Sequence, residues 1–277
     1  MCLAALLFTC MNTMVKFLSP HFSSIEIVWA RTLGHFLFML ALFVPQHGFS
    51  IVRSTRPGTQ LSRSLLSITS TTLYFTALRQ VSLADATAIG FLSPVLVTLL
   101  AAPMLGERIR ARHLLTVLVG FVGVLIVVQP GTEVFRWGSL LIVASSTCFA
   151  MYQVLTRRVA QSDPAETSAI YSALLGSVLM SLLVPLFWTT PASWWQVAML
   201  LVLGLFGGLG HYFVACSMAC APANLMSPFQ YLQLIGAVMF GYFVFGDVPT
   251  IYTWIGAALI MGCGLYLGWY QSRKAIG

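Results

Sequence analysis

The chain consists of long apolar stretches, with its few charged residues gathered in short clusters between them. A helix that crosses the hydrocarbon core of a bilayer needs roughly 20 mostly apolar residues. Dividing the chain at charged and Pro/Gly-rich clusters leaves stretches near that length at residues 1–18, 25–44, 63–81, 85–105, 113–129, 137–157, 166–188, 193–216, 223–245 and 250–270. The pattern predicts an all-α integral membrane protein with ten transmembrane helices.

Composition excludes several classes of protein. Charged residues make up 8% of the 277 residues, whereas about 25% are charged in a soluble domain. The net charge of +7 comes from 14 basic and 7 acidic residues. The basic residues are dispersed in short clusters rather than gathered on one exposed face, as they are in nucleic-acid-binding domains. We therefore expect neither a soluble enzyme nor a nucleic-acid partner.

The basic residues also predict an orientation, because cytoplasmic loops are enriched in Lys and Arg. With ten spans and an inner N-terminus, the inner loops carry Arg53, Arg56, Arg63, Arg108, Arg110, Arg112, Arg157, Arg158, Arg273 and Lys274. Both termini are therefore expected in the cytoplasm. Residues 1–18 lack the basic start and the cleavage site of a signal peptide, so they are expected to span the membrane. Because the sequence starts inside this span, a short N-terminal tail is expected to be missing from it.

An internal repeat divides the chain into two halves. The segment Leu-Gly-Glu-Arg-Ile at 105–109 recurs as Phe-Gly-Asp-Val-Pro at 245–249, and Glu26 recurs as Glu166, both at a spacing of 140 residues. The halves are expected at residues 1–130 and 137–270, followed by a cytoplasmic tail at 271–277.

Each half holds five spans, and an odd number of spans inverts the second half relative to the first. The loops agree, because basic residues follow the first copy of the repeated segment and none follows the second until the end of the next span. Inverted repeats are typical of secondary transporters. A duplication kept for packing alone is the alternative.

The order and spacing of several short segments resemble the EamA-type transporters of the drug/metabolite transporter superfamily over nearly the whole chain. The segments lie at 16–18, Arg31, Pro94, 106–107, 221–223, 227–231, 245–249, 256–260 and 264–266. The resemblance implies a bundle of ten helices in two inverted EamA repeats, which moves small organic solutes by alternating access. It does not identify the solute.

Polar side chains within spans are costly in hydrocarbon, so each is a candidate for solute contact. Lys16 lies near the end of the first span and Arg31 lies six residues into the second. Asn12 and His35 are one helical turn from them on the same helix faces. These four residues would form a polar patch between the first two spans, which either lines a cavity or only joins the helices. For Lys16, an anchor at the membrane interface is the alternative.

Later spans supply further candidates. Span 63–81 carries seven hydroxyl side chains between residues 67 and 76, which we interpret as a cavity wall rather than packing. The remaining candidates for solute contact are polar side chains inside spans, namely Tyr74, Gln153, His211, Tyr212, Ser227, Gln230, Tyr231 and Gln233.

Proline and glycine mark positions where spans bend or pack closely. Pro94 and Pro228 each remove one helix hydrogen bond and bend the axis. Such a kink either exposes backbone carbonyls to a solute or is static. The glycines at 204, 207, 208 and 210 predict backbone-to-backbone packing of their span against a neighbour.

The acidic residues all fall at span ends or in loops, so the interior is expected to be basic and free of acid. Such an interior favours a solute with a carboxylate or phosphate. A proton-driven carrier usually needs a titratable acid in the membrane. We therefore expect gradient-driven facilitation or exchange, with proton coupling through His35 or His211 as the alternative.

Together these features predict a secondary transporter of the bacterial inner (plasma) membrane, acting as a monomer or homodimer. Export of an amino-acid-like or other carboxylate-bearing solute is the first interpretation, with export taken from the resemblance. Import of a vitamin or nucleotide-like metabolite is the alternative, and a non-transporting membrane assembly subunit is the alternative from a different class. Neither a GxSxG elbow nor an HExxH zinc signature occurs in the sequence, so no enzymatic activity, cofactor or metal is expected.

Overall fold

The computed structural model describes residues 1–104, 111–129, 136–221 and 226–276, and the elements within these residues are all helical. The first half contains α1 (Cys2–Leu18), α2 (Ser24–His47), the short 3-10 helix η1 (Gly48–Val52), α3 (Pro57–Ala77), α4 (Leu83–Gly90), α5 (Leu92–Met104) and α6 (Ala111–Val128). The second half contains α7 (Trp137–Val159), α8 (Ala165–Leu183), η2 (Val184–Leu186), α9 (Trp194–Cys220), η3 (Ser227–Tyr231), α11 (Leu232–Phe245) and α12 (Ile251–Ile276). The segment at 105–109, Arg108 and Arg110 lie outside the described residues.

Helix ends follow from local sequence signals. Ser23 and Ser82 cap α2 and α4, where each hydroxyl accepts a hydrogen bond from a backbone N–H three residues later, at 3.1 and 3.0 Å. Pro57 occupies the first turn of α3, where its missing N–H has no helical partner to lose. Gly246 ends α11 in the left-handed conformation, with φ of 70°.

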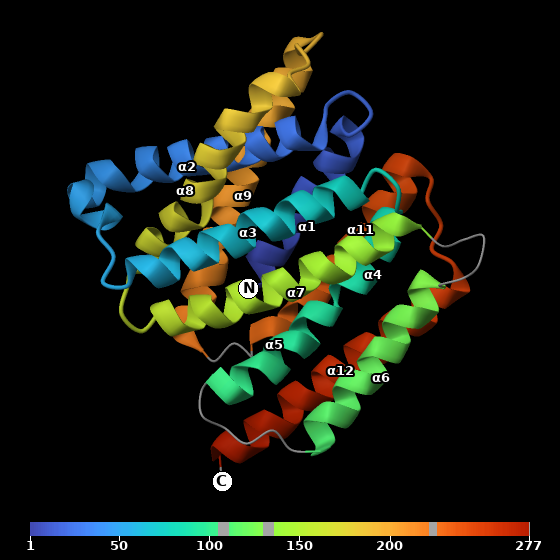
Figure 1. Cartoon of the computed structure of the whole chain (residues 1–277). Helices are drawn as coiled ribbons and strands as arrows, with labels where there is room; N and C mark the ends of the chain where they lie inside the picture. Colours follow the sequence, from blue (N-terminus) through green and yellow to red (C-terminus); the bar gives the residue numbers. More distant parts are fainter. Residues whose placement is uncertain (105–110, 130–135, 222–225, 277) are drawn as a thin grey trace.

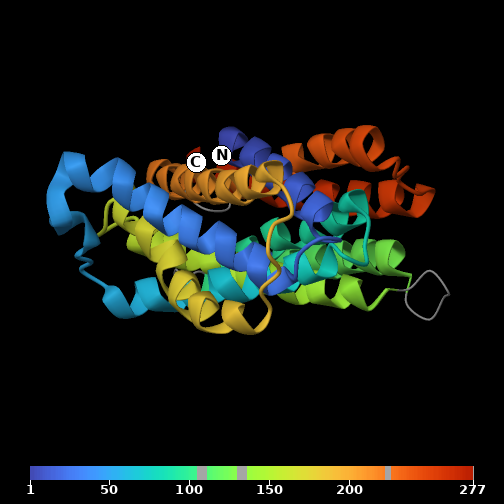
Figure 2. The same cartoon turned by 90° about the horizontal axis from the view of Figure 1, so that it is seen from above.

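The helices pair mainly across the two halves of the chain (Figure 1). Helix α2 packs against α8 and α9, α3 packs against α7, and α6 packs against α12. The view from above shows α2 beside α8 and α9, with α3 beside α7 (Figure 2). Any relative movement of the two halves must therefore occur at these helix pairs.

The predicted close packing at the glycines of α9 is confirmed. A Cβ atom added to Gly204 would lie 2.5 Å from the Cα atom of Gly34 on α2, so the two backbones touch. A Cβ atom at Gly210 would lie 2.5 Å from the ring of Phe8 on α1. The glycines therefore let α9 pack closely against both α2 and α1.

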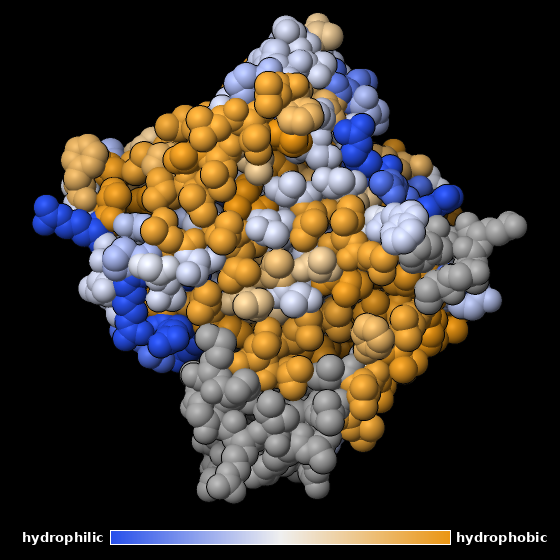
Figure 3. Space-filling model, viewed as in Figure 1, coloured by the Kyte–Doolittle hydropathy of each residue, from blue (hydrophilic) through white to orange (hydrophobic). Residues whose placement is uncertain are grey.

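The distribution of apolar and polar residues is that of a protein in lipid. Large apolar side chains lie on the surface, with Trp194, Phe243 and Leu182 exposed by 82%, 76% and 71%. Arg31 and Arg63 are buried, with exposures of 2% and 0%. Figure 3 shows hydrophobic surface across the molecule and hydrophilic side chains at two opposite edges. The interior thus holds charged side chains, while large apolar side chains face outward.

Four helical segments are long and apolar enough to cross a membrane by themselves: Ser24–Val52, Trp137–Val159, Ala165–Leu186 and Trp194–Cys220. Shorter apolar helices lie at Cys2–Leu18, Leu83–Val97, Leu118–Val128, Phe229–Phe245 and Ile251–Cys263. Helix α3 belongs to neither group because its many hydroxyl side chains lower its hydropathy. Within the described residues, each of the ten predicted stretches lies mainly on helix, while their crossing as ten inverted spans stays a prediction.

Three predicted spans differ from the structure. The stretch 223–245 is divided between η3 and α11. The stretch 85–105 is interrupted, because α4 ends at Gly90 and α5 begins at Leu92, close to Pro94. The stretch 63–81 begins six residues earlier, at Pro57. Arg63, predicted in an inner loop, therefore lies in the second turn of α3, and the loop assignment was wrong.

Candidate functional site

A cavity lies among the helices of the bundle, and the space free of protein atoms in it and at its opening, solvent at the opening included, is ≈ 740 Å³. Helices α1, α2, α3, α4, α5, α7, α9 and α11 and the 3-10 helix η3 contribute side chains or backbone to its wall. Both halves of the chain therefore build this cavity.

Two interrupted segments border the cavity. Gly90, Phe91 and Ser93 lie at the break between α4 and α5, where Pro94 has no N–H to donate to the carbonyl of Gly90. In the second half, Gln230 lies in η3 before α11 begins. Interrupted helices are tolerated at membrane depth where they line a cavity.

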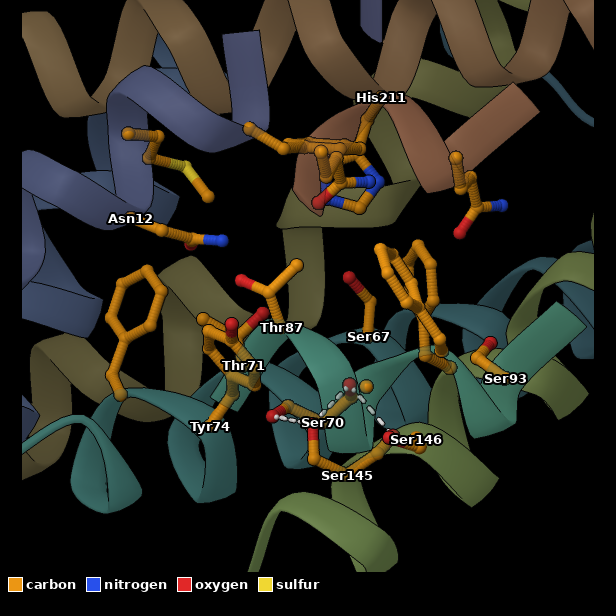
Figure 4. A pocket seen from close by; sticks show the side chains of 18 of the residues that line it. Asn12, Ser67, Ser70, Thr71, Tyr74, Thr87, Ser93, Ser145, Ser146 and His211 are labelled. Carbon is orange, nitrogen blue, oxygen red and sulfur yellow. Dashed lines mark hydrogen bonds between the residues drawn. The ribbon is translucent and has the colours of Figure 1, made fainter. Parts of the chain in front are cut away.

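Neutral hydrogen-bonding groups dominate the wall. Hydroxyl groups come from α3, α4, α5 and α7, at Ser67, Ser70, Thr71, Tyr74, Thr87, Ser93, Ser145 and Ser146. The hydroxyls of Ser70 and Ser145 also join α3 to α7, with an Oγ–Oγ distance of 2.9 Å and a bond from Ser145 to the Ser70 carbonyl of 2.7 Å. Figure 4 shows these serines on the side of the cavity opposite His211. Of the hydroxyl wall predicted in the third span, Ser67, Ser70, Thr71 and Tyr74 line this cavity.

Among the described residues of the cavity wall, Arg31 is the one with a permanent positive charge. Its Nη1 donates to Thr71 Oγ1 at 3.1 Å, and its Nη2 donates to His211 Nε2 at 2.5 Å. Its buried Nε has no hydrogen-bond partner among the described residues. No carboxylate lies among the described lining residues, so the charge has no acidic counterion at the site.

The contacts of His211 define its tautomer. A guanidinium only donates hydrogen bonds, so Nε2 accepts from Arg31 and Nδ1 carries the proton. Nδ1 then donates to the hydroxyl of Tyr152, 2.8 Å away. The His35 ring stacks against the His211 ring, with centroids 5.5 Å apart and an interplanar angle of 19°. His211 is thus held in its neutral form between a cation and a phenol.

Amide side chains connect the two interrupted segments. Gln230 Nε2 donates to Gln153 Oε1 at 2.6 Å, and Gln153 Nε2 donates to Ser93 Oγ at 3.3 Å. Gln153 on α7, which does not itself line the cavity, therefore links η3 to α5 by hydrogen bonds.

The structure brings half of the predicted contact residues to the cavity wall, namely Asn12, Arg31, Tyr74, His211, Gln230 and Gln233. His35 and Gln153 lie one layer behind it. Tyr231 packs edge-on against Phe91, with ring centroids 4.9 Å apart, and does not line the cavity. Tyr212 points elsewhere, its hydroxyl 3.3 Å from Glu166. The side chains of Ser227 and Pro228 lie outside the described residues.

Of the polar patch predicted between the first two spans, Asn12 and Arg31 both line the cavity, whereas Lys16 and His35 do not. Lys16 makes an ion pair with Asp247, beyond the cavity, and its ammonium group lies 4.8 Å from the ring centroid of Phe245. Arg31 and His35 instead face α9, because α2 packs on α9 rather than on α1.

Sequence reasoning missed Arg63, which is buried among α3, α7 and α8. Its basic side chain suggested a loop, although Pro57 carries the usual signal for the first turn of a helix. Among the described residues, no three His, Cys, Asp or Glu side chains gather where they would hold a metal ion.

Comparisons with known proteins agree on one family. The model of the EamA-like transporter family matches residues 1–129 and again residues 136–267. The S-adenosylmethionine uptake transporter of Rickettsia felis is 28% identical over 265 residues, which cover 96% of this chain and 89% of that protein. The riboflavin transporter of Brucella anthropi is 32% identical over 242 residues, which cover 84% of each chain.

One solved crystal structure is similar over 99% of this chain and 96% of its own, with a TM-score of 0.66 and 22% identity. At that identity the likeness concerns the fold alone.

Proposed function

The chain belongs to the EamA-like transporter family, and from that premise we propose that it imports a vitamin or nucleotide-like metabolite by alternating access. As a member of this family it is a multi-pass transporter of small metabolites in the inner membrane. The S-adenosylmethionine uptake transporter among its relatives favours import over the export that the sequence first suggested.

The observation that carries the proposed solute class is the chemistry of the cavity. Four phenylalanine rings, at Phe8, Phe75, Phe91 and Phe149, border it together with neutral hydroxyl and amide groups. Aromatic rings favour a planar solute through stacking or edge contacts. Neutral donors and acceptors match the edges of a heteroaromatic ring or the hydroxyls of a sugar-like chain. S-adenosylmethionine and riboflavin, named for two relatives, both contain a heteroaromatic ring.

Within the cavity, we assign solute contact to Asn12, Arg31, Tyr74, His211, Gln230 and Gln233. Arg31 contacts a carboxylate, phosphate or carbonyl group of the solute, because its buried guanidinium has no acidic partner in the described wall. His35 and Gln153 position His211 and Gln230. Lys16, Tyr212 and Tyr231 are not part of the proposed site.

The proposal includes the inverted arrangement of two five-span halves, with boundaries at 1–130 and 137–270 and both termini in the cytoplasm. The charge difference between the loops at 105–112 and 245–250 supports it. A cysteine introduced at the exposed Arg158 tests it. A membrane-impermeant maleimide should label this position only after the membrane is opened.

The solute is identified by uptake into proteoliposomes. We expect concentrative or exchange uptake of riboflavin, S-adenosylmethionine or a nucleoside from a labelled panel that also holds amino acids. Arg31→Gln should reduce uptake of the accepted solute about tenfold or more, the factor for loss of one charged contact. Arg158→Gln is the matched control, because that arginine is exposed and remote from the cavity. Uptake of amino acids alone would instead support the carboxylate-solute alternative, and no uptake or exchange of any compound would contradict the proposal.

A further inference from the structure

A second polar cluster lies at the end of the bundle where the connection before α3 meets the connection between α7 and α8. Asp163 belongs to the connection between α7 and α8 and is 5% exposed. Its carboxylate accepts hydrogen bonds from Ser54 Oγ, from the Thr55 N–H at 3.0 Å and hydroxyl at 2.6 Å, and from Gln60 Nε2 at 2.8 Å. One buried carboxylate therefore fastens two segments that are about 100 residues apart in the chain.

Arg63 continues this cluster into the bundle. Its guanidinium donates to Thr156 Oγ1 at 3.0 Å, to Ser172 Oγ at 3.3 Å and to Gln60 Oε1. The guanidinium carbon also lies 5.0 Å from the ring centroid of Tyr152. Gln60 bonds both Arg63 and Asp163, so it connects the buried cation to the buried anion. We name Ser54, Thr55, Gln60, Arg63 and Asp163 the Arg63 lock.

Tyr152 connects the Arg63 lock to the cavity. Arg63 Nη2 lies 3.4 Å from the Tyr152 hydroxyl, and that hydroxyl lies 2.8 Å from Nδ1 of His211. The other nitrogen of His211 accepts from Arg31 in the cavity wall. A chain of hydrogen-bonding side chains thus runs from Asp163 to the proposed solute site.

The bonds of this chain cross repeatedly between the halves of the protein. Gln60 and Arg63 lie in the first region matched by the family model, and Asp163, Thr156 and Ser172 lie in the second. The bond between Arg31 and His211 also joins the two regions. When the halves separate at this end, these bonds must break, and water entering the opening can replace each of them. A polar closure of this kind is therefore reversible, as alternating access requires.

We propose that the Arg63 lock closes the Asp163 end of the transport path, and that Tyr152 and His211 make its closure depend on what occupies Arg31. A solute that takes the Arg31 Nη2 donor removes the bond that fixes the His211 tautomer. His211 then no longer holds the Tyr152 hydroxyl in its present position, and the lock loosens on the side to which the solute is released. Tyr152 and His211 act as positioning residues in this scheme. This inference rests on the proposed transport activity, but not on the identity of the transported solute.

Hydrogen–deuterium exchange of the full chain in lipid nanodiscs, without added solute, tests the lock. Asp163→Asn weakens the charged hydrogen bonds, so we expect backbone exchange at 52–60 and 160–168 to become about tenfold faster. Ser62→Ala is the control, because Ser62 is an exposed residue of α3 whose hydroxyl donates to the Gly58 carbonyl of its own helix and takes no part in the lock. Exchange in α6 and α12 reports intact folding. Unchanged exchange at 52–60 and 160–168 in the Asp163 variant would overturn the lock.

A double-variant cycle with Tyr152→Phe tests the connection to the cavity. The phenylalanine keeps the ring and removes the hydroxyl. Arg31→Gln alone should speed exchange at 160–168 about threefold or more, in the range for loss of one hydrogen bond. In the Tyr152→Phe background it should have no further effect. An equal effect of Arg31→Gln with and without the hydroxyl would refute the connection. Because no solute is present, these results do not depend on the proposed import activity.

Discussion

The contact between Gly34 and Gly204 supports a quantitative prediction for Gly204→Ala. The added Cβ atom would lie 2.5 Å from Cα and 2.6 Å from the carbonyl carbon of Gly34, and 2.8 Å from the backbone nitrogen of His35. Carbon atoms in contact are normally about 3.5–4.0 Å apart. All three neighbours are backbone atoms, so a side-chain rotation cannot relieve the clash. Helices α2 and α9 must therefore move apart by about 1 Å.

The expected effect has two opposing parts. Overpacking of this kind costs about 1–3 kcal/mol, while replacing a helical glycine by alanine gains up to about 1 kcal/mol. We expect Gly204→Ala to lower the free energy of unfolding by about 1–2 kcal/mol. The same separation lengthens the 2.5 Å bond between Arg31 and His211 past the normal range of about 3.2 Å. Solute uptake by the Gly204→Ala variant should then fall by more than its loss of folded protein explains.

The free energy of unfolding in mixed detergent micelles, together with proteoliposome uptake, measures both effects. Gly262→Ala is the matched control, because nothing lies within 4 Å of a Cβ atom at that helical position. This control should be as stable as the wild type or slightly more stable. Gly34→Ala, whose Cβ atom would lie 3.0 Å from the Gly204 Cα atom, should be intermediate. A Gly204→Ala protein with wild-type stability and uptake would show that the helices do not touch here.

The ion pair of Lys16 with Asp247 is partly exposed, at 17% and 33%. We expect Lys16→Gln to change the free energy of unfolding by less than about 1 kcal/mol and to leave solute affinity unchanged in a binding titration. Gln153→Leu removes the acceptor of Gln230 and should destabilise the protein by about 1–3 kcal/mol while weakening solute binding; equal affinity would exclude its positioning role. Burial alone would raise the pKa of the Asp163 carboxyl, but hydrogen bonds from the connection before α3 and from α3 outweigh burial and hold the pKa below 3.8. The stability advantage over Asp163→Asn should therefore be constant above about pH 5 and disappear as the pH falls through the lowered pKa, and denaturation across a pH series measures it.

The positions of the helices follow from the sequence because apolar length and helix signals are local properties. Where the structure describes them, the ten predicted stretches lie mainly on helices. The break near Pro94 could be anticipated, since proline removes a helix hydrogen bond. The early start of α3 could also have been found from Pro57, if Arg63 had not been interpreted as a loop residue.

The candidate site was predicted less completely, because depth within a span does not define the face toward which a side chain points. Arg31, His211 and Gln230 reach the cavity, whereas Tyr212 and Tyr231, similarly deep in their spans, do not.

The sequence by itself determined that this chain is a helical membrane protein of a transporter family, because span length, low charge and the repeated order of segments are properties of the linear sequence. Only the tertiary structure decided the roles of its basic residues. Lys16 and Arg63 both lie near the end of a predicted span, yet Lys16 pairs with Asp247 at the surface while Arg63 is buried between α7 and α8. Apart from Gln60, which lies one helical turn from Arg63, the partners named here are about 90 or more residues away along the chain. Such pairings depend on which helices pack together, and spacing within one helix carries no information about that.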